Sequence, residues 1–129
     1  MRPPRLAPTA LVAAALALAA CEHSHGGTPT GATCPTDSTL TWDNFGSAFM
    51  DTYCNACHRT GLKGAERQGA PSDHNFETVE LVRMWLDHLD ETVAAGPDAI
   101  NTAMPIGDGP TPTDEERRQL GEWLACGAP

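Results

Sequence analysis

Apolar side chains recur at helical spacing in three stretches of the chain. The first stretch consists of four aromatic residues three or four positions apart: Trp42, Phe45, Phe49 and Tyr53. This spacing places all four on one face of a helix. Thr41, directly before them, is a candidate N-cap, and the acidic Asp43 suits the positive end of the helix dipole. We therefore predict a helix that begins near Thr41 and runs into Cys54.

The second stretch predicts a helix over about residues 76–95. Its apolar positions fall at i, i+3, i+7, i+10 and i+14: Val79, Val82, Leu86, Leu89 and Val93. Leu81 and Trp85 widen this apolar stripe. Gly96 and Pro97 then end the pattern, because a glycine followed by a proline commonly terminates a helix.

The third stretch is the closing segment of the chain. Thr113 and Glu116 have the spacing of a capping box, so they mark the start of a helix. The inward-facing residues that follow are Leu120, Trp123 and Leu124, and the helix should end by Gly127. No segment alternates with the period of two that is typical of a half-buried strand. We predict an all-α fold with long loops at about 59–75 and 97–112.

The first twenty residues, MRPPRLAPTALVAAALALAA, have a different character. Arg2 and Arg5 precede an apolar run over residues 11–20, which is about half of the roughly 20 residues that span a bilayer. This arrangement is typical of a signal peptide over residues 1–20, and an uncleaved anchor helix is the alternative. The last residues before Cys21, Leu-Ala-Ala, resemble the lipobox of bacterial lipoproteins, which implies that Cys21 is acylated.

The residues after Cys21 are polar. Residues 22–33, EHSHGGTPTGAT, contain no large apolar side chain and are rich in Gly, Thr and Pro. Such a segment has little to bury, so we predict a flexible tether over residues 21–35 and a folded domain over 36–129. His23 and His25 are interpreted as solubilising residues of this tether, with metal binding as the alternative.

Export to an oxidising compartment constrains the five cysteines. With Cys21 lipidated and Cys54 and Cys57 acting as one unit, Cys34 and Cys126 remain. An even pair in such a compartment predicts a disulfide, and two unpaired thiols are the alternative.

Cys54, Cys57 and His58 lie within five residues in the motif C-x-x-C-H. A zinc site would need a fourth ligand, normally from a second close pair, and Cys34 and Cys126 stand far apart. A redox dithiol would sit at a helix N-terminus after a strand, whereas this motif follows a predicted helix. Covalent haem c fits better, because the two thiols add to the vinyl groups of one porphyrin and His58 ligates its iron. The folded part has a thin core, with 5% aromatic residues over the chain, and the macrocycle would complete it.

Met104 is the leading candidate for the second axial ligand, 46 residues after His58. Pro105 favours an extended backbone at Met104, so the thioether can project from a loop. The rival ligands are two histidines, His74 and His88. An open sixth position is a further alternative. Two other methionines fall inside predicted helices and fit core packing instead: Met50 and Met84.

From about Trp42 onward the sequence resembles a small class I c-type cytochrome. The matching features are Gly46 eight residues before Cys54, Phe49, the C-x-x-C-H motif, Met104-Pro105 and the closing helix of residues 114–124. The resemblance implies three to four helices wrapped around one haem, with Gly46 close to Gly121 or Trp123 where the first and last helices cross. Two features depart from the family: the Cys34–Cys126 pair and a polar insertion at about residues 64–75.

With both axial positions held by His58 and Met104, we expect a membrane-tethered monohaem cytochrome that carries single electrons and is not an enzyme. The alternatives are a haem sensor or small peroxidase with an open sixth position, for which His74 is the one candidate acid or base, and a structural lipoprotein without a cofactor.

Charge and sorting signals give expectations about partners. The net charge is −9, and removal of Arg2 and Arg5 with the signal peptide lowers it to −11. Nucleic acid is therefore excluded as a partner, and we expect a monomer that docks on a redox partner with a basic face. The alternative is that the acidity only keeps the protein soluble. Lipid on Cys21 places it on the periplasmic side of a bacterial membrane, and Glu22 favours the outer membrane by resemblance to lipoprotein sorting signals.

Overall fold

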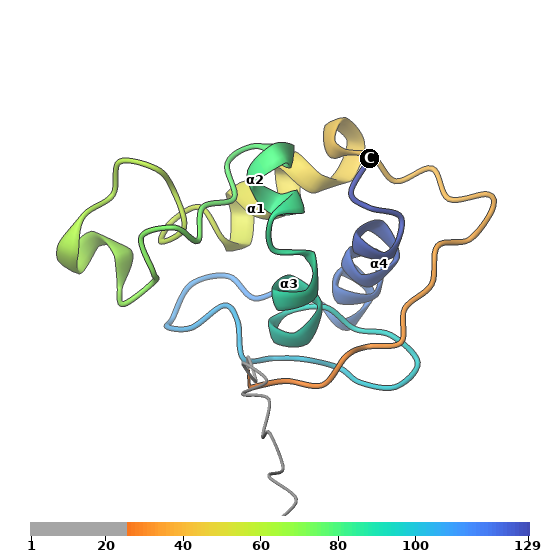
Figure 1. Cartoon of the computed structure of the whole chain (residues 1–129). Helices are drawn as coiled ribbons and strands as arrows, with labels where there is room; N and C mark the ends of the chain where they lie inside the picture. The colour runs from red at the N-terminus through yellow and green to blue at the C-terminus, as the bar shows by residue number, and fades with distance from the viewer. Residues whose placement is uncertain (1–25) are drawn as a thin grey trace, which may run out of the picture.

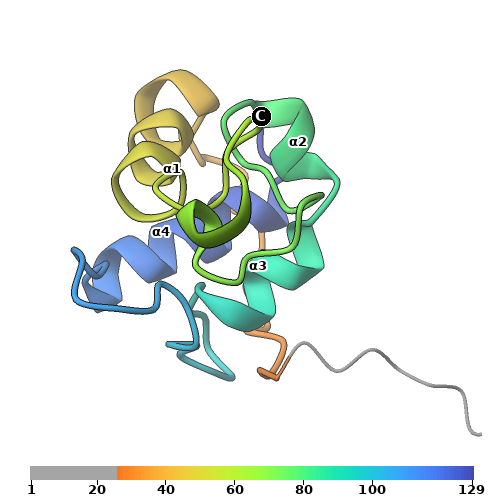
Figure 2. The same cartoon turned by 90° about the vertical axis from the view of Figure 1, so that its left-hand side faces the viewer.

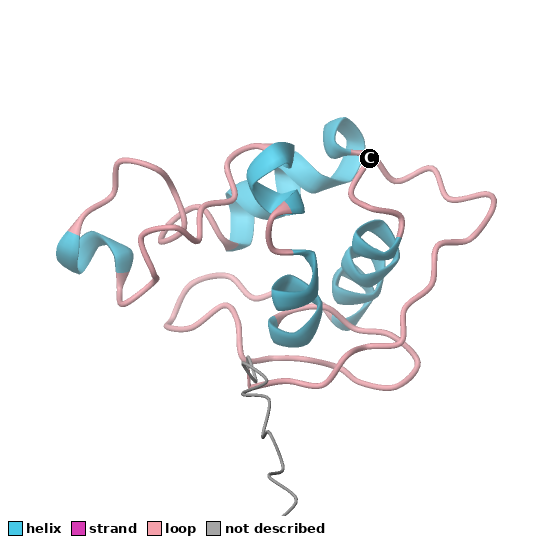
Figure 3. Ribbon diagram, in the orientation of Figure 1, coloured by secondary structure: helices cyan, strands magenta, loops and turns pink. Residues whose placement is uncertain are grey.

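The computed structural model describes residues 26–129, so the predicted signal peptide and Cys21 lie outside the described residues. In chain order the elements are a π-helical turn η1 (Trp42–Gly46), α1 (Ser47–Tyr53), a 3-10 helix η2 (Gly64–Arg67), α2 (Val79–Arg83), α3 (Leu86–Thr92) and α4 (Asp114–Ala125) (Figure 1). Figure 3 shows no strand in this part of the chain, where an isolated bridge joins Ala95 and Ile100. The all-α prediction is confirmed. No helix among these residues is long and apolar enough to cross a membrane.

The first predicted helix forms as η1 followed directly by α1. Thr41 caps it as expected: its hydroxyl accepts from the Asn44 amide at 3.2 Å, and the Asn44 side chain accepts from the Thr41 amide at 2.8 Å. The aromatic face points inward, and Phe49 lies between Phe45, with a tilted ring 5.5 Å away, and Tyr53, with an edge-on ring 4.9 Å away between centroids. The helix ends at Tyr53, so Cys54 begins the turn that follows.

The sequence predicts a single helix over residues 76–95, whereas the structure has two short helices there, α2 and α3. α2 begins at Val79, because Thr78 acts as its N-cap and accepts from the Leu81 amide. The helix breaks at Met84 and Trp85, where the indole of Trp85 stacks on the imidazole of His74 with centroids 3.8 Å apart. The apolar period continues across the break in the sequence, which is why the pattern alone predicted one helix.

α4 matches its prediction closely and organises the core. Its capping box is present, with Thr113 and Glu116 exchanging hydrogen bonds. Trp123 is fully buried and its ring lies against the backbone of Gly46, where an added Cβ would stand 2.6 Å from the ring atom Cη2. Gly121 instead packs against the backbone of Ala95. Of the two expected partners of Gly46, Trp123 is therefore the one in contact, and the lack of a side chain at Gly46 permits the close crossing.

α3 packs against α4, and Figures 1 and 2 show the two helices side by side. α1 joins them through its last residue, since the Tyr53 hydroxyl donates to Glu116 Oε1 at 2.9 Å. The loop between α1 and α2 projects at the left in Figure 1, and the later part of the loop between α3 and α4 lies on the same side.

The prediction of a free tether is wrong for residues 27–33. Thr30 is fully buried, and its amide and hydroxyl donate to the two carboxylate oxygens of Asp90 at 2.8 and 2.5 Å. Asn101 holds Thr28 in the same way, donating to its carbonyl at 2.7 Å and accepting from its amide at 3.3 Å. The prediction counted only apolar side chains, whereas this segment docks through its backbone and a hydroxyl group. We call residues 27–33 the strap.

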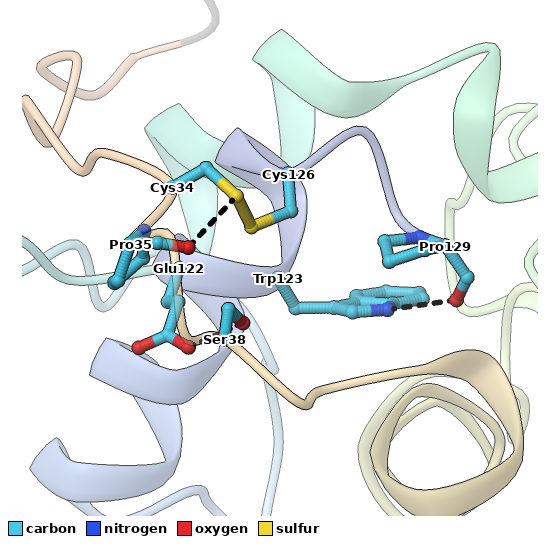
Figure 4. Close-up of a disulfide and its surroundings, with 7 residues drawn as sticks. All are labelled: Cys34, Pro35, Ser38, Glu122, Trp123, Cys126 and Pro129. Atoms are coloured by element: carbon cyan, nitrogen blue, oxygen red, sulfur yellow. Dashed lines mark hydrogen bonds between the residues drawn. A yellow bond between two sulfur atoms is a disulfide. The ribbon is translucent and has the colours of Figure 1, made fainter.

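The Cys34–Cys126 disulfide is present, with Cα atoms 4.8 Å apart and the two cysteines 92 positions apart in sequence. It joins the end of the strap to the end of α4 (Figure 4). Next to it, the Ser38 hydroxyl donates to Glu122 of α4 at 2.6 Å. The N-terminal segment is thus fixed to α3 through Asp90, and to the last turn of α4 through Glu122 and the disulfide.

Candidate functional site

The C-x-x-C-H motif forms a tight turn at the end of α1. The amides of Cys57 and His58 both donate to the Cys54 carbonyl, at 3.1 and 3.0 Å. This turn brings Cys54 and His58, four residues apart, to the same side of the backbone. Cys54 and Cys57 are both reduced. Two thiols and an imidazole therefore stand together at one edge of the helical core.

All three side chains line one cavity of about 200 Å³, whose wall is mainly apolar. Cofactor sites are mainly apolar as well. The apolar part of the wall includes Phe76, Leu89 and Val93, and Met104 lines the cavity from the loop between α3 and α4. The sequence-predicted residues Cys54, Cys57, His58 and Met104 are thus brought together around one apolar space.

His58 is buried, and its Nδ1 lies 2.9 Å from the backbone carbonyl oxygen of His74. A carbonyl can only accept a hydrogen bond, so the proton of the neutral ring belongs on Nδ1 and Nε2 keeps its lone pair. Burial lowers the pKa of His58, which favours this neutral form. The ring also stacks on Phe76 with centroids 4.9 Å apart. A neutral imidazole anchored through one nitrogen is the usual state of a histidine that ligates a metal through the other.

Burial raises the pKa of the Cys54 thiol to about 12. A redox-active or catalytic cysteine has a lowered pKa and is ionised near neutral pH. Cys54 instead behaves as a neutral, apolar side chain at the cavity wall. Among residues 26–129 no three His, Cys, Asp or Glu side chains gather as ligands for a metal ion.

The loop after the motif, which we call the proximal loop (residues 59–75), is built around one buried side chain. Arg67 is 6% exposed and directs its guanidinium inward. Its acceptors are Ala70 O at 3.1 Å, Arg59 O at 2.9 Å, Asn75 Oδ1 at 3.0 Å, His74 O at 3.1 Å and Pro71 O. This arginine therefore fixes the carbonyl that accepts the hydrogen bond from His58.

The loop that carries Met104, which we call the distal loop (residues 97–112), is fixed by a second buried arginine. Arg117 of α4 is 4% exposed, and its Nη1 donates to the carbonyls of Val93, Asn101 and Met104 at 2.7, 2.9 and 3.0 Å. The Met104 amide donates to Thr92 O at 2.9 Å. Met104 is half-buried, and both its carbonyl and its amide are held where its side chain lines the cavity.

The rival ligands lie elsewhere. His74 and His88 are not among the cavity-lining residues of the described chain. His74 stacks on Trp85 and pairs with Asp73 at 3.0 Å, and His88 contacts both His74 and Trp85 edge-on. Of the other methionines, Met50 is fully buried as predicted, but Met84 is 68% exposed at the helix break, so its predicted place in the core is wrong.

None of the protein-family models, curated proteins or solved structures compared with this chain matches it. The site therefore has to be interpreted from its own residues. Sequence reasoning missed both buried arginines. For Arg117 a signal existed, since it lies three and seven positions before the inward-facing Leu120 and Leu124. For Arg67, in a polar stretch without periodicity, the sequence offers none.

Proposed function

We propose that this protein is a monohaem c-type cytochrome that carries single electrons. Cys54 and Cys57 would hold haem c through thioether bonds, and His58 and Met104 would ligate its iron. The observation that carries the proposal is the hydrogen bond from His58 Nδ1 to the His74 carbonyl, because it leaves Nε2 free as a ligand inside a cavity that both thiols and Met104 also line.

The residues present fit this cofactor. The thiols are unpaired and reduced, as attachment requires, and the cavity wall is mainly apolar, as a macrocycle requires. A bound haem supplies one-electron chemistry at its iron. The chain's own part is to hold the imidazole neutral, to present the thioether of Met104 and to keep water from the apolar wall. A thioether ligand and an apolar enclosure both favour the reduced form.

The alternative with an open sixth position, a sensor or small peroxidase, has less support. It would use His74 as an acid or base, and this ring packs against Trp85 instead of lining the cavity. The carboxylate among the cavity-lining residues is that of Asp108, on the distal loop. We keep this alternative as an outcome of the test below.

For its location we propose a lipoprotein, acylated at Cys21 and held on the periplasmic side of a bacterial membrane, with the outer membrane favoured. The chain's net charge of −9 favours a redox partner with a basic face. Association with this partner should weaken as salt screens the charges.

The test is to express the full chain in cells that attach haem c and to measure its mass and spectra. We expect the mass of one covalent haem, weak long-wavelength absorption of sulfur-ligated ferric haem, and a reduced form that resists carbon monoxide. Ready binding of carbon monoxide would favour the sensor or peroxidase. Protein that carries no haem would leave the structural lipoprotein.

A further inference from the structure

Arg67 is a buried cation whose partners are neutral. Its guanidinium donates to four backbone carbonyls and to the amide oxygen of Asn75. Among residues 26–129 the salt bridges involve other side chains, the exposed Arg59 with Asp51 among them. The guanidinium of Arg67 is therefore buried without a carboxylate in salt-bridge contact, and its field is strong at short range. The exposed Asp73 lies within reach of this field: its pKa is lowered by its hydrogen bond to His74 and also by the charge of Arg67.

This charge lies against the residues of the site. Arg67 lines a smaller cavity of about 120 Å³ together with Cys57, His58 and Met104. Its Nη2 donates to the His74 carbonyl oxygen at 3.1 Å, and the same oxygen accepts from His58 Nδ1 at 2.9 Å. One carbonyl therefore serves two donors, a neutral imidazole and a charged guanidinium.

The two donors compete for the same oxygen. A histidine that donates to a strong acceptor becomes a more basic ligand, which stabilises the more highly charged metal. The charged guanidinium is the stronger donor and draws electron density from the carbonyl. His58 therefore donates to a weakened acceptor and stays a less basic ligand. In addition, an unpaired buried cation disfavours a further positive charge nearby.

We propose that Arg67 is a positioning residue that raises the reduction potential of the haem held by His58, acting through the His74 carbonyl and through its own buried charge. This inference rests on the proposed function. The ferric state carries one more positive charge than the ferrous state. A less basic His58 and a nearby cation both disfavour that charge, so both raise the potential. Arg67 also holds the proximal loop in shape, and the experiment has to separate this structural role from the electrostatic one.

The experiment compares two variants that alter the charge of the Arg67 environment in different ways. Arg67→Gln removes the cation and most of its donors. Asn75→Asp keeps Arg67 and an acceptor oxygen 3.0 Å from its Nη1, and adds the missing negative charge. The controls are Arg59→Gln, which removes an exposed arginine of the same loop, and Ser72→Asp, which adds the same charge at an exposed position.

Each protein is expressed with its haem, and the midpoint potential is measured together with the long-wavelength band and the ¹⁵N chemical shift of His58 Nδ1. We expect both Arg67→Gln and Asn75→Asp to shift the potential downward by more than their controls, with the band retained. The Nδ1 shift should move towards a stronger hydrogen bond.

Unchanged potentials in Asn75→Asp and Arg67→Gln, with haem and the Met104 band intact, would overturn the inference and leave the proposed function standing. If Arg67→Gln fails to fold, Asn75→Asp decides alone, because it preserves the guanidinium and its acceptors. Wild-type protein without covalent haem would refute the proposed function itself, and the two failures are thereby distinguishable.

Discussion

The proximal and distal loops are both held by a buried arginine, but the two arginines come from different parts of the chain. Each is a long polar segment, and each has its carbonyls gathered by a buried arginine. Arg67 belongs to the proximal loop itself, and all its acceptors lie between Arg59 and Asn75. Arg117 comes from α4 and joins the end of α3 to two points of the distal loop.

This difference predicts a difference in stability. The proximal loop is closed on itself and can distort with little effect on the helices. The distal loop shares its anchor with the core, because Arg117 lies between Thr113, where α4 is capped, and the buried Leu120. Displacement of Met104 should therefore couple to global unfolding, whereas displacement of the His74 carbonyl should remain local.

The largest effect is expected when haem can no longer attach to Cys54 and Cys57. The double variant Cys54→Ala with Cys57→Ala should carry no covalent haem and should lose most of its helicity, because the cavity between the loops then stays without its apolar occupant. Circular dichroism and mass spectrometry measure both outcomes. A double variant with native helicity would show that haem is not needed to complete the core.

The next largest effect should come from the distal loop alone. Met104→Ala should lose the long-wavelength band, lower the potential and open the iron to carbon monoxide. His74→Ala is the matched control in the proximal loop, since it keeps the backbone carbonyl that serves His58. It should leave all three properties unchanged, as should Met84→Ala. If His74→Ala is the variant that changes the spectrum, the axial assignment is wrong.

A third prediction compares the anchors themselves. Arg117→Gln should lower the free energy of unfolding by about 3 kcal/mol, because hydrogen bonds from charged groups contribute roughly 1.5–3 kcal/mol each and their carbonyls stay buried. Urea denaturation of haem-loaded protein measures the change. The adjacent Arg118→Gln should cost less than about 0.5 kcal/mol, because Arg118 is exposed. Arg67→Gln should fall between the two, and an effect of Arg67→Gln as large as that of Arg117→Gln would contradict the difference between the loops.

The smallest effect concerns the start of α4. Thr113→Ala should cost about 1 kcal/mol at neutral pH by removing the cap. Hydrogen bonds from the Thr113 backbone and side chain hold the pKa of Glu116 below its ordinary 4.5. A carboxyl with a lowered pKa stabilises the folded state at pH values above its ordinary pKa. This stabilisation is lost as the pH falls through the pKa of the folded state. The difference between wild type and Thr113→Ala should therefore shrink below pH 4.5, and a constant difference would argue against the Glu116 contribution.

The sequence predicted those features that depend on periodicity or on short motifs. The aromatic face ending at Tyr53, the capping box of Thr113 and Glu116 and the Cys34–Cys126 disulfide are all confirmed. For Gly46 the resemblance left two partners open, Gly121 and Trp123, and the structure has Trp123 in contact. The same reasoning placed Met104 on a loop, and it lines the cavity from the loop between α3 and α4. The lipid at Cys21 and the haem remain predictions.

The features that sequence could not predict depend on polar burial. Arg67, Arg117 and Thr30 are residue types that usually lie in water, and their burial follows from backbone carbonyls and a carboxylate that come together only in the fold. The break at Trp85 has the same origin, because its partner His74 lies outside the helical pattern. The apolar period records which face is covered, and it carries no information about where a polar group finds its partner.

The strap determines which parts of the domain take up a pull from the N-terminal side. On the proposed attachment of lipid at Cys21, Gly27 lies six positions after the anchor, and a chain spanning that distance reaches about 20 Å when fully extended. A pull on the anchor is taken up by Asp90 in α3 and, through the disulfide, by the last turn of α4. The distal loop also lies on this path, because its residue Asn101 is hydrogen-bonded to Thr28 of the strap, whereas the proximal loop does not. A pull on the anchor would therefore be transmitted to the loop that carries Met104 and not to the loop that follows His58.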